Sequence, residues 1–319
     1  MALGKKFRTS TRMQAKASIM IEGLTGKGKS GLALAFARAL ASSWDKIYAI
    51  DTENMALDLF VDIPMHTGAR FESINKVDLT PEDGYAPSNY KALRDEAIDA
   101  GAEVVIMDSY SHAWTRQGGV LDKVSKVKST SRSANDYTAW NDEEVSKEKN
   151  LIFDLVRSPK AHIITTVRSK EKFALEMNEA KGKNEVVSLG EQQIQQDGLK
   201  YEPDLVLRMI SPGNTKGKAP VALIIKSRYA ILEEGIEYEF TDDLLKQVAS
   251  YLAEGTSPEI LLEQQRKNYI EGVKEYCEGN KTRMSIWRNI KETAGHKDSK
   301  IEEIPLADLR DMFIQLTQD

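Results

Sequence analysis

A glycine-rich segment of eight residues near the N-terminus limits the possible folds of this chain more than any other feature. Residues 23–30 read Gly-Leu-Thr-Gly-Lys-Gly-Lys-Ser and fit the pattern G-x-x-x-x-G-K-[ST] in full. An apolar run at 18–22 precedes the segment, and an Ala/Leu-rich run at 31–42 follows it. The first run is typical of a strand and the second of a helix. A strand, a glycine loop and a helix in this order predict an α/β domain.

The glycine segment has the chemistry of a phosphate-binding loop. Glycines let backbone N–H groups approach phosphate oxygens, and the N-terminus of the next helix adds partial positive charge. Lys29 can reach β- and γ-phosphates, and Ser30 can offer its hydroxyl to Mg²⁺. Lys27 either contacts phosphate or is exposed. ATP and Mg²⁺ are therefore the predicted cofactors, and the residues predicted to bind nucleotide are Gly23, Leu24, Thr25, Gly26, Lys27, Gly28, Lys29, Ser30, Gly31 and Thr166.

Short apolar runs alternate with amphipathic stretches through the first 250 residues. The runs lack strict alternation of polar and apolar residues, which is typical of strands buried on both faces of a sheet. We predict a mostly parallel central sheet flanked by helices. The expected strands are 18–22, 46–51, 103–108, 162–167, 204–210 and 221–226, and the expected helices are 31–42, 87–100 and about 136–156.

Carboxylates follow two of these strands. Asp108 ends the strand at 103–108, from which it can bind Mg²⁺ beside Ser30. Glu53 lies two residues past the second strand and can orient or deprotonate water. Asp51 is close by, and either acid could instead cap the following helix, a role that fits Asp51 better. Past the fourth strand, Thr166 and its neighbours are placed to sense a γ-phosphate.

Charge is unevenly distributed along the 319 residues. The net charge is −5, from 44 Lys and Arg against 49 Asp and Glu, which does not favour nucleic acid as a partner. The expected arm at 1–17 is nevertheless basic, and either binds nucleic acid or aids solubility. Its cations are Lys5, Lys6, Arg8, Arg12 and Lys16.

Composition limits the cellular setting. Cys277 is the single cysteine, so the chain forms no internal disulfide and no zinc site of several cysteines. No apolar run has the roughly 18 residues that a membrane span needs. We expect a soluble, cytoplasmic protein without a membrane partner. The four histidines are scattered, and His162, beside a core strand, fits a structural role.

Two polar stretches interrupt the pattern, at 115–135 and 170–201. We expect both to be long loops, which are usually functional or disordered. The first stretch has five cations and one acid, a charge of +4 that could neutralise DNA phosphates or be merely solvated. From residue 254 to 319 the sequence is charged and helix-forming, and apolar residues at 269–276 and 304–316 predict a small packed bundle. The expected division is 1–17, 18–253 and 254–319.

Several segments together resemble the RecA-like recombinase ATPases. Residues 49–58 are similar to the strand of that family that ends in Asp-x-Glu, which implies that Glu53 is the catalytic glutamate. Residues 104–109 (VVIMDS) resemble its second nucleotide motif. Residues 223–228 resemble its late strand, which implies that Lys226 and Arg228 act in trans on a neighbouring subunit. Such a pair at a strand end is also a common exposed edge feature. The catalytic residues implied are thus Glu53, Lys29, Lys226 and Arg228.

A narrower resemblance involves Trp140 and the stretch from 162 to 202. These segments look like the phage-encoded, minimal RecA-like ATPases of the Sak group, which implies annealing or strand pairing on single-stranded DNA. Residues just past Glu53 are out of register with the adenine-stacking region of larger recombinases. The 254–319 segment has no matching motif.

The family resemblance also gives the two polar stretches a role, because the corresponding loops of RecA-like proteins hold DNA. Phe173 could stack on a base. The DNA-binding residues implied are Arg116, Lys123, Lys126, Lys128, Arg132, Lys170, Lys172 and Phe173.

The leading hypothesis is a Mg²⁺-dependent ATPase that binds single-stranded DNA, is stimulated by it, and forms filaments or rings with ATP at subunit interfaces. A single-strand-binding protein is a further expected partner. A RecA-fold hexameric helicase and a nucleotide-switched assembly or regulatory protein are the alternatives. Oligomer number, DNA polarity and the adenine contacts stay open at this point.

Overall fold

The computed structural model describes residues 12–65, 70–130, 135–178, 183–213 and 218–317. Side chains are not described at 173–189 within β5 and β6, nor at a few positions near the start of α8. The chain divides into two compact units. One comprises 15–252, and the other comprises 1–14 together with 253–319. Each unit is described by itself below.

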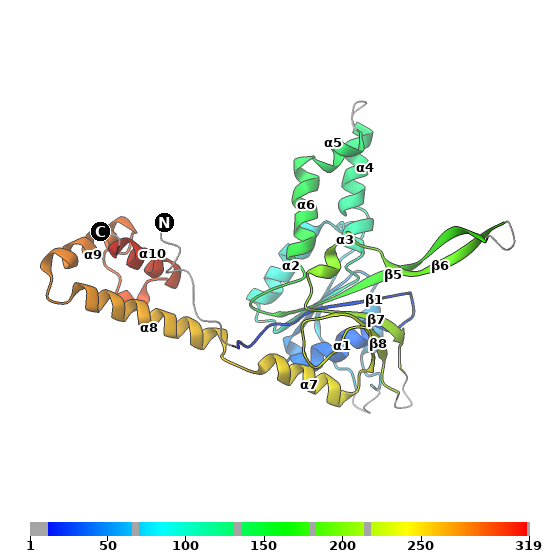
Figure 1. Cartoon of the computed structure of the whole chain (residues 1–319), viewed down its shortest axis with the longest axis horizontal. Coiled ribbons are helices and arrows are strands. Elements are labelled where there is room, and N and C mark those ends of the chain that lie inside the picture. The colour runs from blue at the N-terminus through cyan, green and yellow to red at the C-terminus, as the bar shows by residue number, and fades with distance from the viewer. Residues whose placement is uncertain (1–11, 66–69, 131–134, 179–182, 214–217, 318–319) are drawn as a thin grey trace. The chain divides into compact units, whose positions relative to one another are not determined.

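A central sheet organises the unit 15–252 (Figure 1). Its strand order is β3-β2-β4-β5-β1-β7-β8-β9, and β6 pairs with β5 outside this path. The pairs from β3 to β7 are parallel, whereas β8 and β9 add antiparallel pairs. The bounds are β1 Ser18–Gly23, β2 Ile47–Asp51, β3 Asn75–Asp78, β4 Val104–Asp108, β5 His162–Asn178, β6 Lys183–Gln193, β7 Leu205–Ser211, β8 Val221–Ser227 and β9 Glu237–Glu239.

Helices cover both faces of this sheet, so the central strands are apolar on both sides. Ile19 and Ile21 of β1 pack on one face with α1 and α7, whereas Met20 faces the other layer with α2 and α6. The predicted fold class, a mostly parallel sheet flanked by helices, is confirmed. The helix bounds are α1 Lys29–Leu40, α2 Pro87–Asp99, α3 His112–Thr115, α4 Val120–Thr130, α5 Asp136–Trp140, α6 Glu143–Asp154 and α7 Asp242–Ala253. Short 3-10 turns lie at Trp44–Lys46, Ala56–Phe60 and Leu199–Tyr201.

The first polar stretch, expected as a loop at 115–135, is largely helical where it is described. Val120 and Val124 are buried, and Val127 packs against the same core. Their spacing of four and three residues places them on one helix face, which holds α4 in position. The helix expected at 136–156 is interrupted, because Asp142 caps a new helix by accepting hydrogen bonds from the backbone N–H groups of Glu144 and Val145.

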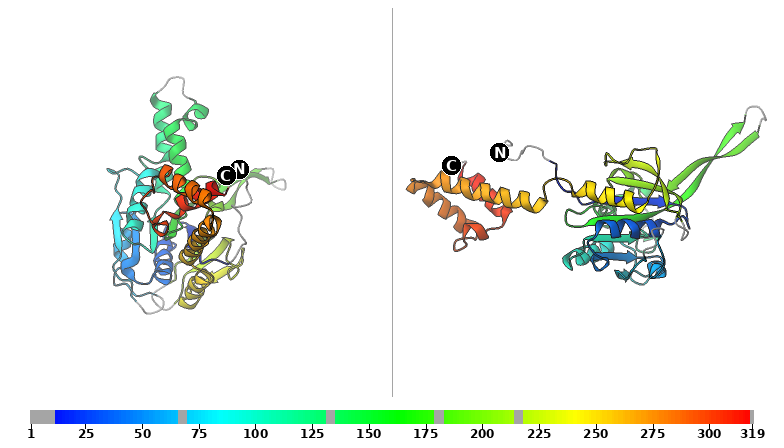
Figure 2. Two further views of the ribbon diagram at one scale, coloured as in Figure 1. Left: turned by 90° about the vertical axis from the view of Figure 1, so that its left-hand side faces the viewer. Right: turned by 90° about the horizontal axis from the view of Figure 1, so that it is seen from below.

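The second polar stretch, expected as a loop at 170–201, is mostly a β-hairpin. Strand β5 continues to Asn178 and pairs with antiparallel β6. The hairpin projects from the body of the unit, as the right-hand view of Figure 2 shows. Polar residues suit a ribbon that is not covered by helices, so their composition concealed the strands.

The described end of the basic arm is not free. Met13 forms a bridge with Thr256, and Gln14 N–H donates to the Thr256 carbonyl at 3.0 Å. Arg12 forms an ion pair with Glu254 at 2.8 Å. Ala17 is buried in the sheet unit. The expectation of a free arm at 1–17 is therefore wrong for 12–17, while residues 1–11 lie outside the described residues.

The unit that includes 253–319 is a small helical bundle with its own core. It contains α8 Pro258–Cys277, α9 Lys281–Thr293 and α10 Leu306–Leu316, with a 3-10 turn at Ile301–Glu303. The bundle predicted for this segment is confirmed. Its buried residues are Ile270, Val273, Cys277, Ile290, Ile304, Leu309, Met312 and Leu316. In the described part of the chain, no helix combines the length and apolar character needed to cross a membrane.

A buried histidine, His162, makes the stability of the sheet unit depend on pH. Ala17 N–H donates to His162 Nδ1 at 2.8 Å, so this nitrogen must be unprotonated. Burial lowers the pKa of His162 from 6.5 to about 4. Between these two pH values the unfolded chain binds the proton and the native chain does not. The contribution of His162 to the free energy of unfolding is therefore fully present above pH 6.5, and it is lost as the pH is lowered towards 4.

We expect His162→Asn to reduce this acid sensitivity, because the asparagine oxygen can accept the same bond without titrating. Wild type should lose up to about 3 kcal/mol through this group between neutral pH and pH 4. Urea unfolding of both proteins across this range measures the difference. Equal slopes of unfolding free energy against pH would contradict the assignment. His112, whose pKa burial also lowers to about 4, contributes equally to both proteins.

Candidate functional site

The phosphate loop lies between β1 and α1, at the carboxyl ends of the parallel strands. Gly26 and Gly28 have φ angles of 77° and 83°, a region that favours glycine. A Cβ on Gly28 would also lie 2.6 Å from Pro212 Cβ, so neither the backbone conformation nor the space allows a side chain there. The structure therefore explains the glycine at this position of the motif.

Helix α1 begins at Lys29 directly after this loop. Gly28 is the N-cap and supplies no side-chain hydrogen bond, so the first turn keeps N–H groups for a ligand. Lys29 Nζ donates to the Leu24 carbonyl at 3.0 Å within the loop. Burial lowers the pKa of Lys29, while Asp108 and Glu53 act in the opposite direction. Lys27 Nζ donates to the Ile210 carbonyl at 3.3 Å.

Asp108 ends β4 and is 2% exposed. Burial raises its pKa, while the hydroxyls of Ser30 and Thr166 favour the charged form. Thr166 Oγ1 donates to Asp108 Oδ1, so this residue, predicted to bind nucleotide, positions the carboxylate in this structure. The Oδ2 atom is buried and has no hydrogen-bond partner among the described residues.

These residues fit a Mg²⁺ ion. The buried Asp108 Oδ2 lacks a donor, and the Ser30 hydroxyl is close enough to affect the pKa of Asp108. Carboxylate and hydroxyl oxygens are the ligands that Mg²⁺ prefers, and it is commonly held by one or two of them plus substrate phosphates. No cluster of three His, Cys, Asp or Glu side chains able to hold a metal occurs in the described ranges. The site thus suits a metal that arrives with a nucleotide.

Glu53 follows β2 and is held by an arginine from β5. Arg168 Nε donates to Glu53 Oε1 at 2.8 Å, and Arg168 Nη2 donates to Oε2. This bidentate geometry is the strongest arrangement of such a pair. Arg168 is the last residue of β5 that pairs with β1, opposite Gly23, and Ser169 already pairs with β6. The ion pair therefore lies where β5 leaves the sheet.

Asp51 has a structural role, because its carboxylate caps the turn that follows β2. Its Oδ1 accepts from Glu53 N–H at 2.8 Å, and its Oδ2 accepts from Leu57 N–H at 3.0 Å. Both bonds fix the turn that follows β2. Glu53 makes no such cap, so its carboxylate is available to Arg168.

A cavity of about 380 Å³ adjoins Glu53. Its walls include Glu53, His112, Arg116 and Arg168. The His112 ring is 4% exposed and its Nδ1 lies 2.8 Å from Thr52 Oγ1. Burial lowers the pKa of His112 to about 4, so the ring is neutral at physiological pH. We therefore treat this cavity as part of the predicted hydrolytic centre around Glu53.

Lys226 and Arg228 lie near the amino ends of the parallel strands, whereas the phosphate loop lies at their carboxyl ends. Strand β8 runs antiparallel to β7, so Val206 near the start of β7 pairs with Lys226. Lys226 Nζ donates to the carbonyls of Tyr201 and Pro203, at 2.5 and 2.6 Å. Arg228 forms an ion pair with Asp204 at 2.9 Å. Within one chain, the side chains of Lys226 and Arg228 therefore do not lie at the site formed by Glu53 and Lys29.

The candidate DNA-binding lysines of α4 have acidic partners. Lys126 pairs with Asp122 at 2.7 Å, and Lys128 pairs with Asp136. Lys123 pairs with Glu144 and also lies 3.4 Å from Glu148. The charge of +4 already includes Asp122, and the helices that follow α4 place three further carboxylates beside its lysines, those of Asp136, Glu144 and Glu148.

The remaining DNA candidates occupy varied positions. Arg116, Lys170 and Lys172 are exposed, and Arg116 faces the cavity beside Glu53. Arg132 lies outside the described residues. Phe173 lies in β5, opposite Ser188.

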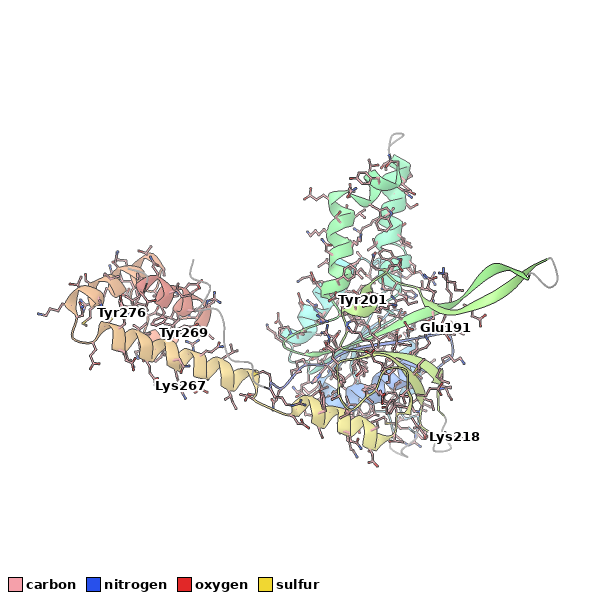
Figure 3. The ribbon with its side chains drawn as sticks, viewed as in Figure 1. Glu191, Tyr201, Lys218, Lys267, Tyr269 and Tyr276 are labelled. Carbon is pink, nitrogen blue, oxygen red and sulfur yellow. The ribbon has the colours of Figure 1, made fainter. Side chains whose placement is uncertain are left out.

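Glu191 is a site residue that sequence reasoning missed. It lies in β6 at the base of the hairpin, opposite Glu171 (Figure 3). Burial lowers the pKa of Lys29, and the charge of Glu191 is among those that oppose this effect, so Glu191 lies near the phosphate loop. Its Oε2 atom is buried without a hydrogen-bond partner in the described part of the chain. The surrounding polar stretch gave no signal for it.

A family model described as an AAA domain, AAA_24, matches residues 15–234, more than half of the chain. Comparison with curated proteins gives no match. Among solved structures, the RadB recombinase is similar over 72% of this chain and 90% of its own, at 16% identity and a TM-score of 0.38, a likeness too weak to support an argument. The matched region spans the phosphate loop, Glu53, Asp108 and Arg168, and the chain belongs to the AAA domain family AAA_24.

Proposed function

We propose that this chain is a Mg²⁺-dependent ATPase that binds single-stranded DNA, acts in recombination and assembles as a homo-oligomer. The observation that carries the proposal is the Glu53–Arg168 ion pair. It joins the predicted water-activating carboxylate to β5 at the point where this strand leaves the sheet and forms the projecting hairpin. A ligand on the hairpin can thereby affect hydrolysis.

The roles in hydrolysis follow from the positions of the side chains. Lys29 exchanges the Leu24 carbonyl for phosphate oxygens, and the first turn of α1 contributes N–H donors. Ser30 and Asp108 would hold Mg²⁺, which neutralises phosphate charge when bound. Glu53, once released by Arg168, orients water and accepts its proton.

The finer assignment is annealing or strand pairing of the kind found in the phage-encoded Sak group. Exposed Lys170 and Lys172 follow Arg168 on the hairpin and support contact with DNA phosphates. Lys226 and Arg228 lie away from the phosphate loop of their own chain, which suits a role at the ATP site of a neighbour. A cytoplasmic location and a single-strand-binding partner complete this proposal.

Steady-state ATP hydrolysis with and without single-stranded DNA tests the proposed function. We expect turnover to need Mg²⁺ and to rise with DNA, and the rise to decrease at high salt because phosphate contacts are screened. Duplex DNA at the same phosphate concentration is the control. Absence of DNA binding and of stimulation at low salt would refute the proposal.

A nucleotide-switched assembly protein is the second candidate. The separate core of the helical unit favours it, because such a unit can dock a protein partner without changing the ATPase unit. Rapid ATP turnover that depends only on DNA would count against this candidate.

A further inference from the structure

One buried ring nitrogen beside the hydrolytic centre has no partner. The His112 side chain is 4% exposed, and its Nε2 atom is buried without a hydrogen bond to any described residue. Buried polar atoms in folded proteins are nearly always paired, because leaving one unpaired is unfavourable. The ring also lines the cavity of about 380 Å³ that adjoins Glu53. The unpaired nitrogen therefore indicates a ligand in this cavity.

The other ring nitrogen fixes His112 relative to Glu53. His112 Nδ1 lies 2.8 Å from the hydroxyl of Thr52, and Thr52 directly precedes Glu53 in the chain. The Ser109 backbone N–H donates to the same hydroxyl at 2.8 Å, which holds that hydroxyl in place. The Tyr85 ring packs against the imidazole, with centroids 5.3 Å apart and an interplanar angle of 60°. The imidazole is thus held in one orientation, as a group that positions a reactant must be.

The charge around this nitrogen favours a neutral ligand. Arg168 lines the cavity and is bonded to the Glu53 carboxylate, so these two opposite charges face each other. Burial, together with the nearby Arg168, lowers the pKa of His112 to about 4, so the ring is neutral at physiological pH. A neutral imidazole has one N–H donor and one acceptor nitrogen. Water can pair with Nε2 in either tautomer, because it both donates and accepts.

The cavity also has the size and polarity that a bound water needs. A water molecule takes about 30 Å³ of liquid volume and is held by two to four polar partners. The cavity exceeds this volume, and its walls include the carboxylate of Glu53 as well as the His112 ring. One water can therefore be shared between the predicted proton acceptor and the unpaired nitrogen.

We propose that His112 Nε2 and the Glu53 carboxylate together hold the water that attacks ATP. The inference rests on the proposed function and adds one residue to its hydrolytic centre. The water oxygen forms a bond to the γ-phosphorus, and the bond from this phosphorus to the bridging oxygen of ADP breaks. Glu53 takes the water proton. His112 gains and loses no proton in this step, and directs the water oxygen towards the phosphorus.

Two substitutions at His112 separate this role from a structural one. Asparagine carries its polar atoms as far from the backbone as Nδ1, and glutamine carries them as far as Nε2. His112→Asn can therefore keep the bond to Thr52 but leaves nothing at the Nε2 position, whereas His112→Gln reaches that position. We expect turnover to fall about 10²-fold in His112→Asn and to recover in part in His112→Gln. A purely structural role predicts the opposite order, which would overturn the inference.

Steady-state ATP hydrolysis by the full chain, with Mg²⁺, measures kcat and KM, and titration with a fluorescent ATP analogue measures affinity. We expect the loss in kcat, with affinity changed less than about twofold, because the water is bound apart from the nucleotide. His162→Asn is the matched control, since His162 is also a buried histidine but bonds to Ala17. Its turnover at neutral pH should equal that of wild type.

Thermal melting shows whether each variant folds. Should His112→Asn unfold, Thr52→Val decides the question, because it keeps the imidazole but removes the hydroxyl that orients it. Turnover of this variant should fall at least about tenfold with affinity retained. Unchanged turnover in the folded variant would overturn the inference.

Combination with Glu53→Gln gives a readout that a structural role would not change. If both side chains hold the same water, removing either one already displaces it. The double variant of Glu53→Gln and His112→Asn should then lose little more turnover than Glu53→Gln alone, because residues that act as a unit are not additive. Losses that multiply would show that the two residues act independently, against the inference.

The outcomes separate the inference from the proposed function. If wild type hydrolyses no ATP, the proposed function fails and the inference with it. If wild type hydrolyses ATP and folded His112→Asn does so equally well, only the inference is overturned. Inorganic phosphate is the second probe. If it inhibits wild type and His112→Asn relieves this inhibition, the cavity holds an anion at His112 and the assignment to water is overturned.

Discussion

Replacing Lys29 with alanine is expected to abolish ATP turnover and to weaken nucleotide binding. The partly buried ammonium group lies close enough to Asp108 and Glu53 to interact with both, at the loop where phosphate charge has to be balanced. Removing one such electrostatic contact typically costs 10²–10³-fold in turnover, so we expect a loss of about 10³-fold. Steady-state hydrolysis and titration with a fluorescent ATP analogue measure the two effects.

Lys27→Ala is the matched control, because Lys27 belongs to the same loop but bonds to the Ile210 carbonyl. We expect less than about a tenfold loss of turnover in this variant. An equal loss in both variants would show that the loop binds phosphate differently from the proposal. Thermal melting should be similar for the two, since neither side chain belongs to the core.

Replacing Glu53 with glutamine is expected to separate binding from hydrolysis. The amide has nearly the same shape but is a poor proton acceptor, so turnover should fall about 10²–10⁴-fold while ATP binding is retained. The same change also removes the charge that Arg168 contacts. Single-turnover hydrolysis together with nucleotide affinity measures both effects. Loss of ATP affinity in proportion to turnover would contradict a role in the chemical step.

Arg168→Gln provides the complementary variant, because it frees the Glu53 carboxylate without removing it. We expect turnover in the absence of DNA to rise and stimulation by DNA to decrease. If turnover without DNA instead falls to the level of Glu53→Gln, Arg168 acts in hydrolysis and does not restrain Glu53.

The sequence predicted the sheet best where burial is complete. Strands β1 and β4 are buried along their whole length, so their apolar composition identifies them. Strand β3, with the sequence NKVD, is short and mostly exposed, and it carries no apolar pattern. The hairpin of β5 and β6 is polar for the same physical reason, since no helix covers it.

The site shows a similar limit. The phosphate loop is contiguous, and its motif places Lys29 and Ser30 without tertiary information. The Glu53–Arg168 pair joins residues 115 positions apart, and the registers of β2 with β4 and of β4 with β5 bring them together. The stack of Trp114 on Trp140 likewise joins residues of two different helices, α3 and α5. Spacing in sequence gives no signal for such pairs.

The bridge between Met13 and Thr256 has a practical consequence for truncation. Residues 12–14 belong to the same unit as 253–319, so a deletion from residue 254 onwards removes Glu254 and Thr256, the partners of that N-terminal segment. Such a deletion would leave residues 12–14 without these partners, so DNA binding by the truncated chain would not represent that of the intact protein. To study the sheet unit by itself, residues 1–14 and 253–319 should therefore be deleted together, which leaves Ala15–Leu252.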